Sequence, residues 1–172
     1  NFRFFADQLI ELGEEAFEMN EFVSRTEWDP SGVTVVITPW NAPLMLATWR
    51  IAPALAAGNS VVAKPPEWAP LSASILADLT REAGLPDGAF NVVQGIGEEA
   101  GAALVAHPLL RRVSFTGSPE TGRHIAGAAR QGRVQAGHPR TAIVRTMTRC
   151  GACEAGNPKG ARFCNACGER LD

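Results

Sequence analysis

The sequence of 172 residues contains no cysteine before position 150. The first 149 residues therefore offer no thiol nucleophile, no thiolate metal ligand and no disulfide partner. Acidic side chains are missing over a second stretch, because the segment from Thr121 through Cys153 has no Asp or Glu but six Arg. Any catalytic or metal-binding site within the first 149 residues must therefore be built without cysteine.

Long apolar runs and a large net charge are also lacking. The longest apolar run, APLMLATW, is far shorter than the ~20 residues that a bilayer-spanning helix needs. No basic segment followed by an apolar one opens the sequence, as a secretory signal would. A formal net charge of -2 gives no general field that would attract nucleic acid or an anionic membrane. We therefore expect a cytoplasmic protein with no membrane partner.

The residues that are present favour one main globular domain, with 45% apolar and 20% charged side chains. The chain opens at Asn1 directly in a helix-like apolar pattern, Phe2, Phe5, Leu9, Leu12 and Phe17, as if it began in mid-domain. From Gly32 to about Ala129, short β-branched runs alternate with helical patterns, which is typical of βαβ units. This alternation predicts an α/β fold with a doubly wound parallel sheet, in which ligands bind at the carboxyl ends of the strands. The expected strands are 33–38, 59–64, 90–95 and 111–117, and the expected helices are 44–57, 71–84, 97–107 and 119–130.

Four short motifs follow these expected strands in order. They are ITPWNAP (37–43), KPPE (64–67), GIGEEAG (95–101) and FTGSPETG (115–122). Together they resemble the coenzyme-binding half of the aldehyde dehydrogenase superfamily, over residues 1 to about 129. The segments NFRFFAD and PWNAPLMLATWRIAPALAAGN are most similar to the branch that oxidises semialdehydes from the breakdown of aromatic compounds. The resemblance implies an incomplete Rossmann-like sheet that binds NAD.

Glycines at two of these strand ends indicate where a dinucleotide would lie. Gly117 and Ser118 follow a strand and open a helix, so their backbone N–H groups and the helix dipole suit a pyrophosphate. Gly95, Gly97 and Gly101 form a G-x-G-x-x-x-G pattern, which by itself is more typical of plain turns and close packing than of a cofactor site. The resemblance favours a cofactor contact for this second cluster.

The cofactor choice depends on Lys64 and Glu67, which stand just past an expected strand. The resemblance implies that both bind the adenosine ribose hydroxyls, whereas the residues alone are equally compatible with an exposed, solvated loop. A carboxylate at the ribose would repel a 2'-phosphate, so Glu67 favours NAD over NADP. Pro39 and Trp40 would shape the nicotinamide side, although core packing is the default interpretation of Trp40 alone. The implied cofactor residues are Ile37, Thr38, Pro39, Trp40, Lys64, Glu67, Gly95, Gly101, Thr116, Gly117 and Ser118.

Asn41 is the residue to which the resemblance gives a direct catalytic role, as a donor to the oxyanion of the reaction. An Asn in a turn can instead bond its own backbone. The family's reaction also needs a cysteine nucleophile and a glutamate base. The segment ELGG that should carry the glutamate is replaced by RQGRVQAGHPRTAIVR, and every cysteine lies in a separate paired module. We therefore expect the chain alone to have no dehydrogenase activity and at most weak NAD binding.

The cysteines form a C-x2-C-x10-C-x2-C pattern made by Cys150, Cys153, Cys164 and Cys167. Four thiolates at this spacing predict a closed, structural Zn site, and the segment resembles a zinc ribbon. A redox pair or an iron–sulfur cluster fits the spacing less well. Ribbons of this type more often serve protein contacts or plain structure than nucleic-acid binding, so a protein partner is the partner that we expect for it.

The sequence thus predicts three parts: a partial coenzyme-binding domain over 1–129, an Arg-rich linker or join over 130–148, and a zinc ribbon over 149–172. Two other interpretations fit the same residues. In one, the ribbon is a binding or regulatory module and the α/β segment is inert or senses nucleotides. In the other, the chain is a fused or frameshifted gene product, since the segment from Met147 onward looks like the start of another zinc-ribbon protein.

Overall fold

The computed structural model describes residues 1–12, 15–19, 22–131, 141–149, 152, 156–158 and 170. The chain divides into two compact units, one made of Asn1–Glu11 and Pro30–Arg140 and the other of Leu12–Asp29 and Thr141–Asp172. No helix in the described part is long and apolar enough to cross a membrane. All four cysteines of the predicted zinc site lie outside the described residues.

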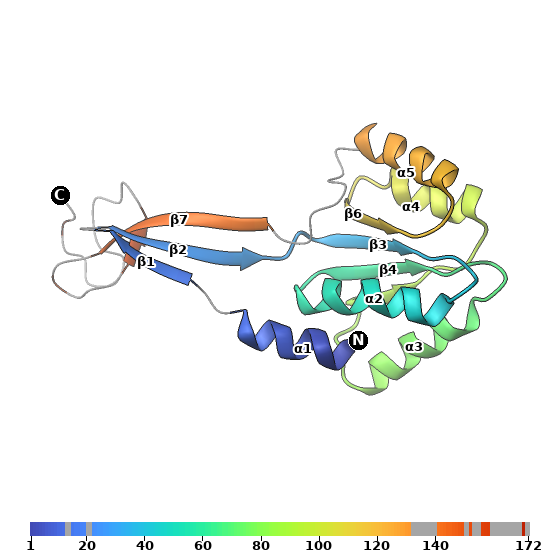
Figure 1. Cartoon of the computed structure of the whole chain (residues 1–172), viewed down its shortest axis with the longest axis horizontal. Coiled ribbons are helices and arrows are strands. Elements are labelled where there is room, and N and C mark those ends of the chain that lie inside the picture. Colours follow the sequence, from blue (N-terminus) through green and yellow to red (C-terminus); the bar gives the residue numbers. More distant parts are fainter. Residues whose placement is uncertain are drawn as a thin grey trace. The chain divides into compact units, whose positions relative to one another are not determined.

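The first unit is built on a parallel sheet with the strand order β5-β4-β3-β6. Helices α1, α2 and α3 cover one face, and α4 and α5 cover the other (Figure 1). The predicted α/β fold with a parallel sheet is therefore confirmed. The strands are β3 (Val33–Ile37), β4 (Ser60–Lys64), β5 (Phe90–Val92) and β6 (Leu110–Phe115), and the helices are α1 (Phe2–Glu11), α2 (Pro43–Ala56), α3 (Leu71–Glu82), α4 (Ala102–Ala106) and α5 (Pro119–Gln131).

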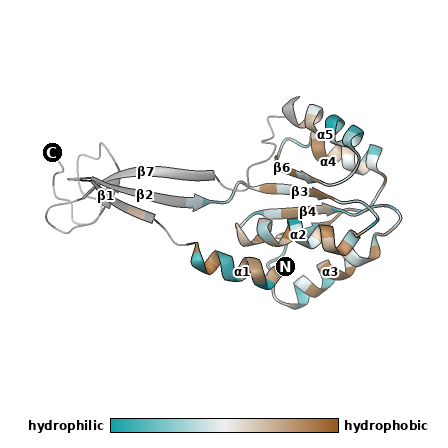
Figure 2. Cartoon of the chain, viewed as in Figure 1, coloured by the Kyte–Doolittle hydropathy of each residue, from teal (hydrophilic) through white to brown (hydrophobic). Residues whose placement is uncertain are grey.

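Two apolar clusters, one on each face of the sheet, hold this unit together. Neighbouring residues of a strand point to opposite faces, so Val35 and Val36 of β3 belong to different clusters. Val36 packs with Ile51 of α2 and with β4, whereas Val35 packs with Leu110 of β6 and Ala129 of α5. Apolar residues are accordingly concentrated in the central strands (Figure 2).

Helix α2 begins and ends at residues that favour a helix start and a helix stop. Pro43 opens the helix, where its missing N–H costs nothing, and Gly58 follows the helix at a φ of 76°. The side chain of the buried Asn59 then donates to the Ala54 carbonyl (3.1 Å) and accepts from the Gly32 N–H (3.0 Å). Gly58 thus ends α2, and Asn59 ties the end of α2 to the start of β3.

The region after β5 differs from the predicted strand and helix. Strand β5 ends at Val92, and the expected helix 97–107 is split into a π-helical turn, η1 (Gly97–Gly101), followed by α4. Gly95 sets this geometry, because its φ is 144° and a Cβ placed on it would lie 2.8 Å from the Ala100 Cβ. The turn can therefore pack closely against position 95 only if the residue there is glycine.

The second unit contains an antiparallel sheet with the order β1-β2-β7-β8. Its strands are β1 (Glu15–Met19), β2 (Phe22–Asp29), β7 (Thr141–Arg149) and β8 (Gly156–Pro158). Strands β2 and β7 pair from Asp29 opposite Thr141 to Phe22 opposite Thr148.

This sheet bears on two predictions. The helical pattern at the start of the chain ends at Glu11, and Phe17 lies in strand β1 instead. In the segment 130–148, for which the sequence predicts a linker or join, α5 runs on to Gln131 and the strand β7 begins at Thr141 and ends at Arg149. The physical reason is that β-branched residues, which favour strands, fill most of TAIVRTMTR, and β2 offers them an edge to pair with.

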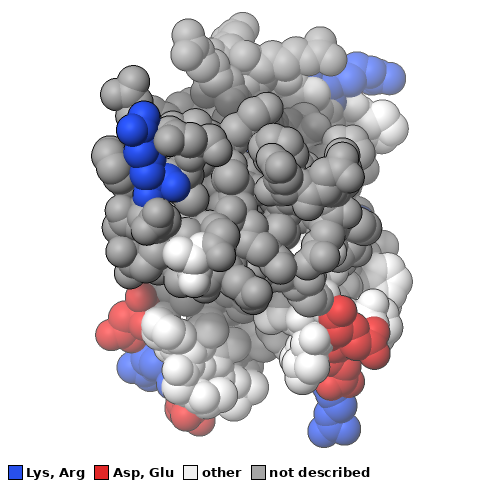
Figure 3. Space-filling model, turned by 90° about the vertical axis from the view of Figure 1, so that its left-hand side faces the viewer, with Lys and Arg blue, Asp and Glu red and all other residues white. Residues whose placement is uncertain are grey.

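Charges on the surface are mixed in sign. In the lower part of the view in Figure 3, acidic and basic side chains of described residues lie next to one another. This arrangement agrees with the net charge of -2.

Candidate functional site

The carboxyl ends of the four parallel strands meet at one edge of the first unit. Hydrogen bonds extend the sheet beyond the strands, from the Thr116 N–H to the Ile37 carbonyl (3.1 Å) and from the Thr38 N–H to the Lys64 carbonyl (3.4 Å). The Val93 N–H likewise donates to the carbonyl of Ala63 (2.9 Å). The four predicted motifs therefore follow neighbouring strands at the edge where α/β sheets bind ligands.

Lys64 and Glu67 form an ion pair at this edge, with Nζ and Oε1 3.0 Å apart. The Lys64 side chain is 3% exposed and the Glu67 side chain 37% exposed. The backbone N–H of Glu67, the Lys64 ammonium and the Gly97 backbone lower the pKa of the Glu67 carboxyl, against a smaller opposing effect of burial. Glu67 is therefore ionised at neutral pH, and Lys64 is a buried, paired cation rather than part of a solvated loop.

The glycine-rich turn η1 lies against this pair. A Cβ on Gly97 would be 3.8 Å from the Glu67 carboxylate, and a Cβ on Gly101 would be 4.0 Å from the Lys64 side chain. The two motifs KPPE (64–67) and GIGEEAG (95–101) are thus brought together, and the Glu67 carboxylate keeps an exposed side that can accept hydrogen bonds.

The start of α5 retains free hydrogen-bond donors. Ser118 caps the helix, because its Oγ accepts from the Thr121 N–H (3.1 Å), and its carbonyl accepts from the Gly122 N–H (3.0 Å). Pro119 has no N–H to offer. Within the described residues, nothing accepts from the N–H groups of Gly117 and Ser118. These two groups are the donors available to an anion at this helix entry.

Two further observations at the same strand end fit a bound dinucleotide. The Thr116 Oγ1 is buried and has no hydrogen-bond partner in the described part of the chain. A Cβ on Gly117 would lie 2.5 Å from Cζ of Phe115, so glycine at this position leaves room for the Phe115 ring. An unpartnered hydroxyl that a ligand could satisfy, and a loop backbone packed on the Phe115 ring, are both compatible with a pyrophosphate site.

The predicted nicotinamide side is open. Trp40 is 67% exposed, so the default interpretation as a core residue is wrong for this unit. Asn41 is exposed, and its amide has no partner among the described residues, so the alternative of a bond to its own backbone is not observed. Thr38 is buried, and Ile37 packs against the core cluster around Val35. Ile37 can therefore offer a cofactor only limited side-chain surface.

Sequence reasoning missed the role of Phe115. Its ring lies between Gly117 and Gly122, at 3.5 Å from a Cβ placed on Gly122. The signal was present as an aromatic residue followed by two glycines in FTGSPETG, but only the structure shows that the ring fills the space which both glycines leave.

Comparisons with known proteins show which proteins this chain resembles. The family model described as "Aldehyde dehydrogenase family" matches residues 1–138. A phenylacetaldehyde dehydrogenase of Pseudomonas fluorescens is 59% identical over 103 residues, which are 60% of this chain and 20% of that protein. A 2-hydroxymuconic semialdehyde dehydrogenase of Pseudomonas sp. (strain CF600) is 45% identical over 138 residues, which are 77% of this chain and 28% of that protein.

Solved structures of aldehyde dehydrogenases are also similar to this chain. PnpE from Pseudomonas sp. WBC-3, also solved in complex with nicotinamide adenine dinucleotide, aligns with a TM-score of 0.74 and 38% identity over 78% of this chain and 28% of that one. An NAD+ complex of an aldehyde dehydrogenase from Bacillus cereus aligns with a TM-score of 0.74 and 37% identity, with the same coverage. The chain therefore spans less than a third of the relatives that it matches.

Proposed function

This chain belongs to the aldehyde dehydrogenase family, and we propose that its first unit is the NAD-binding part of such an enzyme. The observation that supports this most directly is that the cluster of Lys64, Glu67 and the turn Gly97–Gly101 lies at the same edge of the parallel sheet as the free donors at the start of α5. Bound NAD would supply a hydride acceptor for the oxidation of an aldehyde.

We assign the two ends of the site as follows. Lys64 and Glu67 hold the adenosine ribose, and the N–H groups of Gly117 and Ser118 with the Thr116 hydroxyl hold the pyrophosphate. The ionised Glu67 carboxylate repels a 2'-phosphate, so the chain prefers NAD to NADP. We propose Asn41, whose amide has no partner among the described residues, as the donor to an oxyanion that develops on an aldehyde.

Oxidation itself needs a nucleophile and a base that the first unit does not provide. Its described residues contain no cysteine, Glu67 is already paired with Lys64, and Glu98 and Glu99 lie in the first turn of η1, where acidic side chains favour the helix dipole. We therefore propose that this chain alone binds NAD without producing NADH from aldehydes such as semialdehydes.

The test is a titration of the full chain with NAD and NADP, followed by tryptophan fluorescence, for the protein and for Glu67→Gln. We expect NAD to bind more tightly than NADP, and the variant to lose about tenfold in NAD affinity while the preference over NADP disappears, since about 1.4 kcal/mol corresponds to tenfold. Glu82→Gln, an exposed carboxylate at the end of α3, is the matched control and should bind like the unaltered chain. A variant that still rejects NADP would refute the role of Glu67, and NADH formation on addition of an aldehyde would refute the proposed inactivity.

For the cysteine segment we propose a structural zinc site, on the strength of the C-x2-C-x10-C-x2-C spacing. The purified chain should contain about one zinc ion per molecule by metal analysis, as four thiolates form one closed tetrahedral site. Cys164→Ser should lose most of this metal, whereas Ser72→Ala in α3 should keep it. Metal-free protein with four reactive thiols would contradict the site.

We further propose that the zinc ribbon contacts a protein partner.

A further inference from the structure

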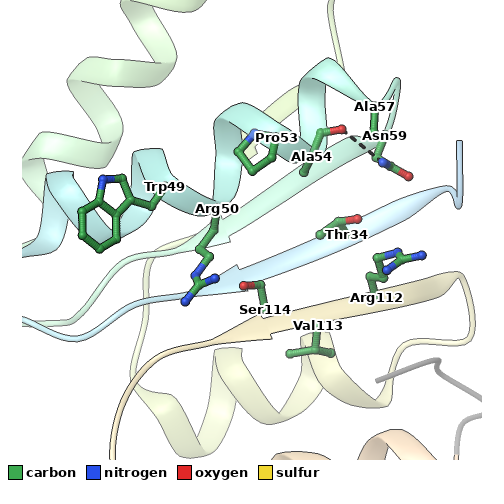
Figure 4. A pocket seen from close by; sticks show the side chains of 10 residues that line it. All are labelled: Thr34, Trp49, Arg50, Pro53, Ala54, Ala57, Asn59, Arg112, Val113 and Ser114. Carbon is green, nitrogen blue, oxygen red and sulfur yellow. Dashed lines mark hydrogen bonds between the residues drawn. The ribbon is translucent and has the colours of Figure 1, made fainter. Parts of the chain in front are cut away.

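A cavity of about 260 Å³ lies in the first unit between α2 and the strands β3 and β6 (Figure 4). None of the residues that line it belongs to the predicted dinucleotide site. Its floor is formed near the amino-terminal half of the strands, where Thr34 pairs with Arg112, and its wall is formed by α2. The cavity is therefore a feature separate from the edge at which NAD is proposed to bind.

Two cations enter this cavity from different elements. Arg50 reaches down from α2, and Arg112 comes from β6 (Figure 4). Within the described part of the chain, neither guanidinium is paired with a carboxylate, and no Asp or Glu lines the cavity. The Nε of Arg112 donates to the Ser31 Oγ (2.9 Å), which fixes the side chain and leaves its other donors free. The cavity therefore carries two positive charges without a described counterion.

The floor carries a hydroxyl that lacks a partner. Thr34 is 4% exposed, and among the described residues nothing bonds its Oγ1. Asn59, which also lines the cavity, already uses its side-chain amide: its oxygen accepts from the Gly32 N–H and its nitrogen donates to the Ala54 carbonyl. Burying an unbonded hydroxyl costs free energy. Thr34 is thus a buried polar group of this floor that a ligand would satisfy, and Ser114 of β6 brings a second hydroxyl to the same cavity.

The wall of the cavity is apolar. It is formed by Trp49, Pro53 and Ala54 of α2 and by Ala57, which directly follows this helix. The Trp49 indole is half exposed. A ligand that fits must therefore combine an anionic head for the floor with an apolar, flat body for the wall. A guanidinium matches a planar carboxylate through two parallel hydrogen bonds.

We propose that this cavity binds a small organic carboxylate. The head lies between Arg50 and Arg112 and accepts a hydrogen bond from the Thr34 hydroxyl, and the body packs against Trp49. This site is independent of the proposed NAD site, because the two share no residue.

Benzoate is the probe that we choose, titrated into the full chain and followed by calorimetry. Benzoate should bind with one site per chain, and benzamide, which has the same shape without the charge, should bind at least about tenfold more weakly because it cannot pair with a guanidinium. Inorganic phosphate carries charge without an apolar body and should also bind more weakly. Tighter binding of phosphate than of benzoate would overturn the carboxylate assignment, and equal binding of benzamide would overturn the role of the charge.

Variants separate binding from folding. Arg50→Gln and Arg112→Gln should each weaken benzoate about tenfold, whereas Arg123→Gln, which removes an exposed charge from α5, should not. Thr34→Val replaces the unbonded hydroxyl with a methyl group, so it should keep or raise the melting temperature of the free chain and yet weaken benzoate. Unchanged benzoate affinity in Thr34→Val, or in both arginine variants, would refute the proposed site. NAD binding should persist in all these variants. A loss of benzoate binding can therefore be told apart from a failure of the proposed NAD site.

Discussion

Replacing Gly117 with alanine is expected to weaken NAD binding by about tenfold or more, which corresponds to about 1.4 kcal/mol or more. The new Cβ would lie 2.5 Å from Cζ and 2.9 Å from Cε2 of Phe115, well inside contact distance. The ring also lies close to Gly122 at the start of α5, where a Cβ would be 3.5 Å from Cε1 of Phe115, so a shift of the ring would disturb this helix entry as well. Crowding of this kind typically costs about 1–3 kcal/mol. The loop must then move, and the N–H groups of Gly117 and Ser118 lose their position.

Gly127→Ala is the control for this prediction. Gly127 lies in the same helix, and a Cβ there would meet nothing within 4 Å. Alanine in a helix interior is more favourable than glycine by about 1 kcal/mol, so this variant should be more stable and bind NAD unchanged. NAD titrations and thermal unfolding of both variants check the pair. If Gly117→Ala bound NAD as well as Gly127→Ala, the start of α5 would not be the pyrophosphate site.

The second large effect is expected from Ile51→Ala, which should lower the free energy of unfolding by about 2–5 kcal/mol. Ile51 is 0% exposed and packs in one cluster with Val36 and Val61. Its loss leaves a cavity between α2 and the sheet that the close-packed neighbours fill only in part. Since small domains are stable by about 5–15 kcal/mol in total, the variant should unfold at a clearly lower urea concentration.

Ile75→Ala is the matched control, because the same atoms are removed from a side chain on α3 that is 58% exposed. Surface substitutions of this kind usually change stability by less than about 0.5 kcal/mol. Urea unfolding of both variants, followed by far-ultraviolet circular dichroism, gives the comparison. Equal destabilisation by the two substitutions would show that the cluster around Ile51 is not the core of the unit.

The parts of the fold that the sequence predicts well depend on neighbours along the chain. The strands around Val35 and Val61 and the helices α2, α3 and α5 follow from local periodicity, and Gly58 and Gly84 mark helix ends because a positive φ is easy for glycine alone. The α/β class follows from their alternation. The family followed from four motifs whose spacing places them all at strand ends.

The burial of Lys64 could not be predicted in this way. A Lys and a Glu three residues apart are compatible with an exposed loop, and only the tertiary structure shows that the Lys64 side chain is 3% exposed, with η1 close to it. The π-helical turn itself depends on the contact between Gly95 and Ala100, which a helical pattern in the sequence does not reveal.

By itself the sequence determined the order of strands and helices in the first unit, the edge that carries Asn41, Lys64, Glu67 and Gly117, and the cysteine spacing that predicts zinc. The tertiary structure alone decided the pairing of Thr141–Arg149 with Phe22–Asp29 and the cavity between Arg50 and Arg112. Both join segments far apart in the chain. Such contacts depend on which edges and faces the rest of the fold leaves open, and local propensity carries no information about that.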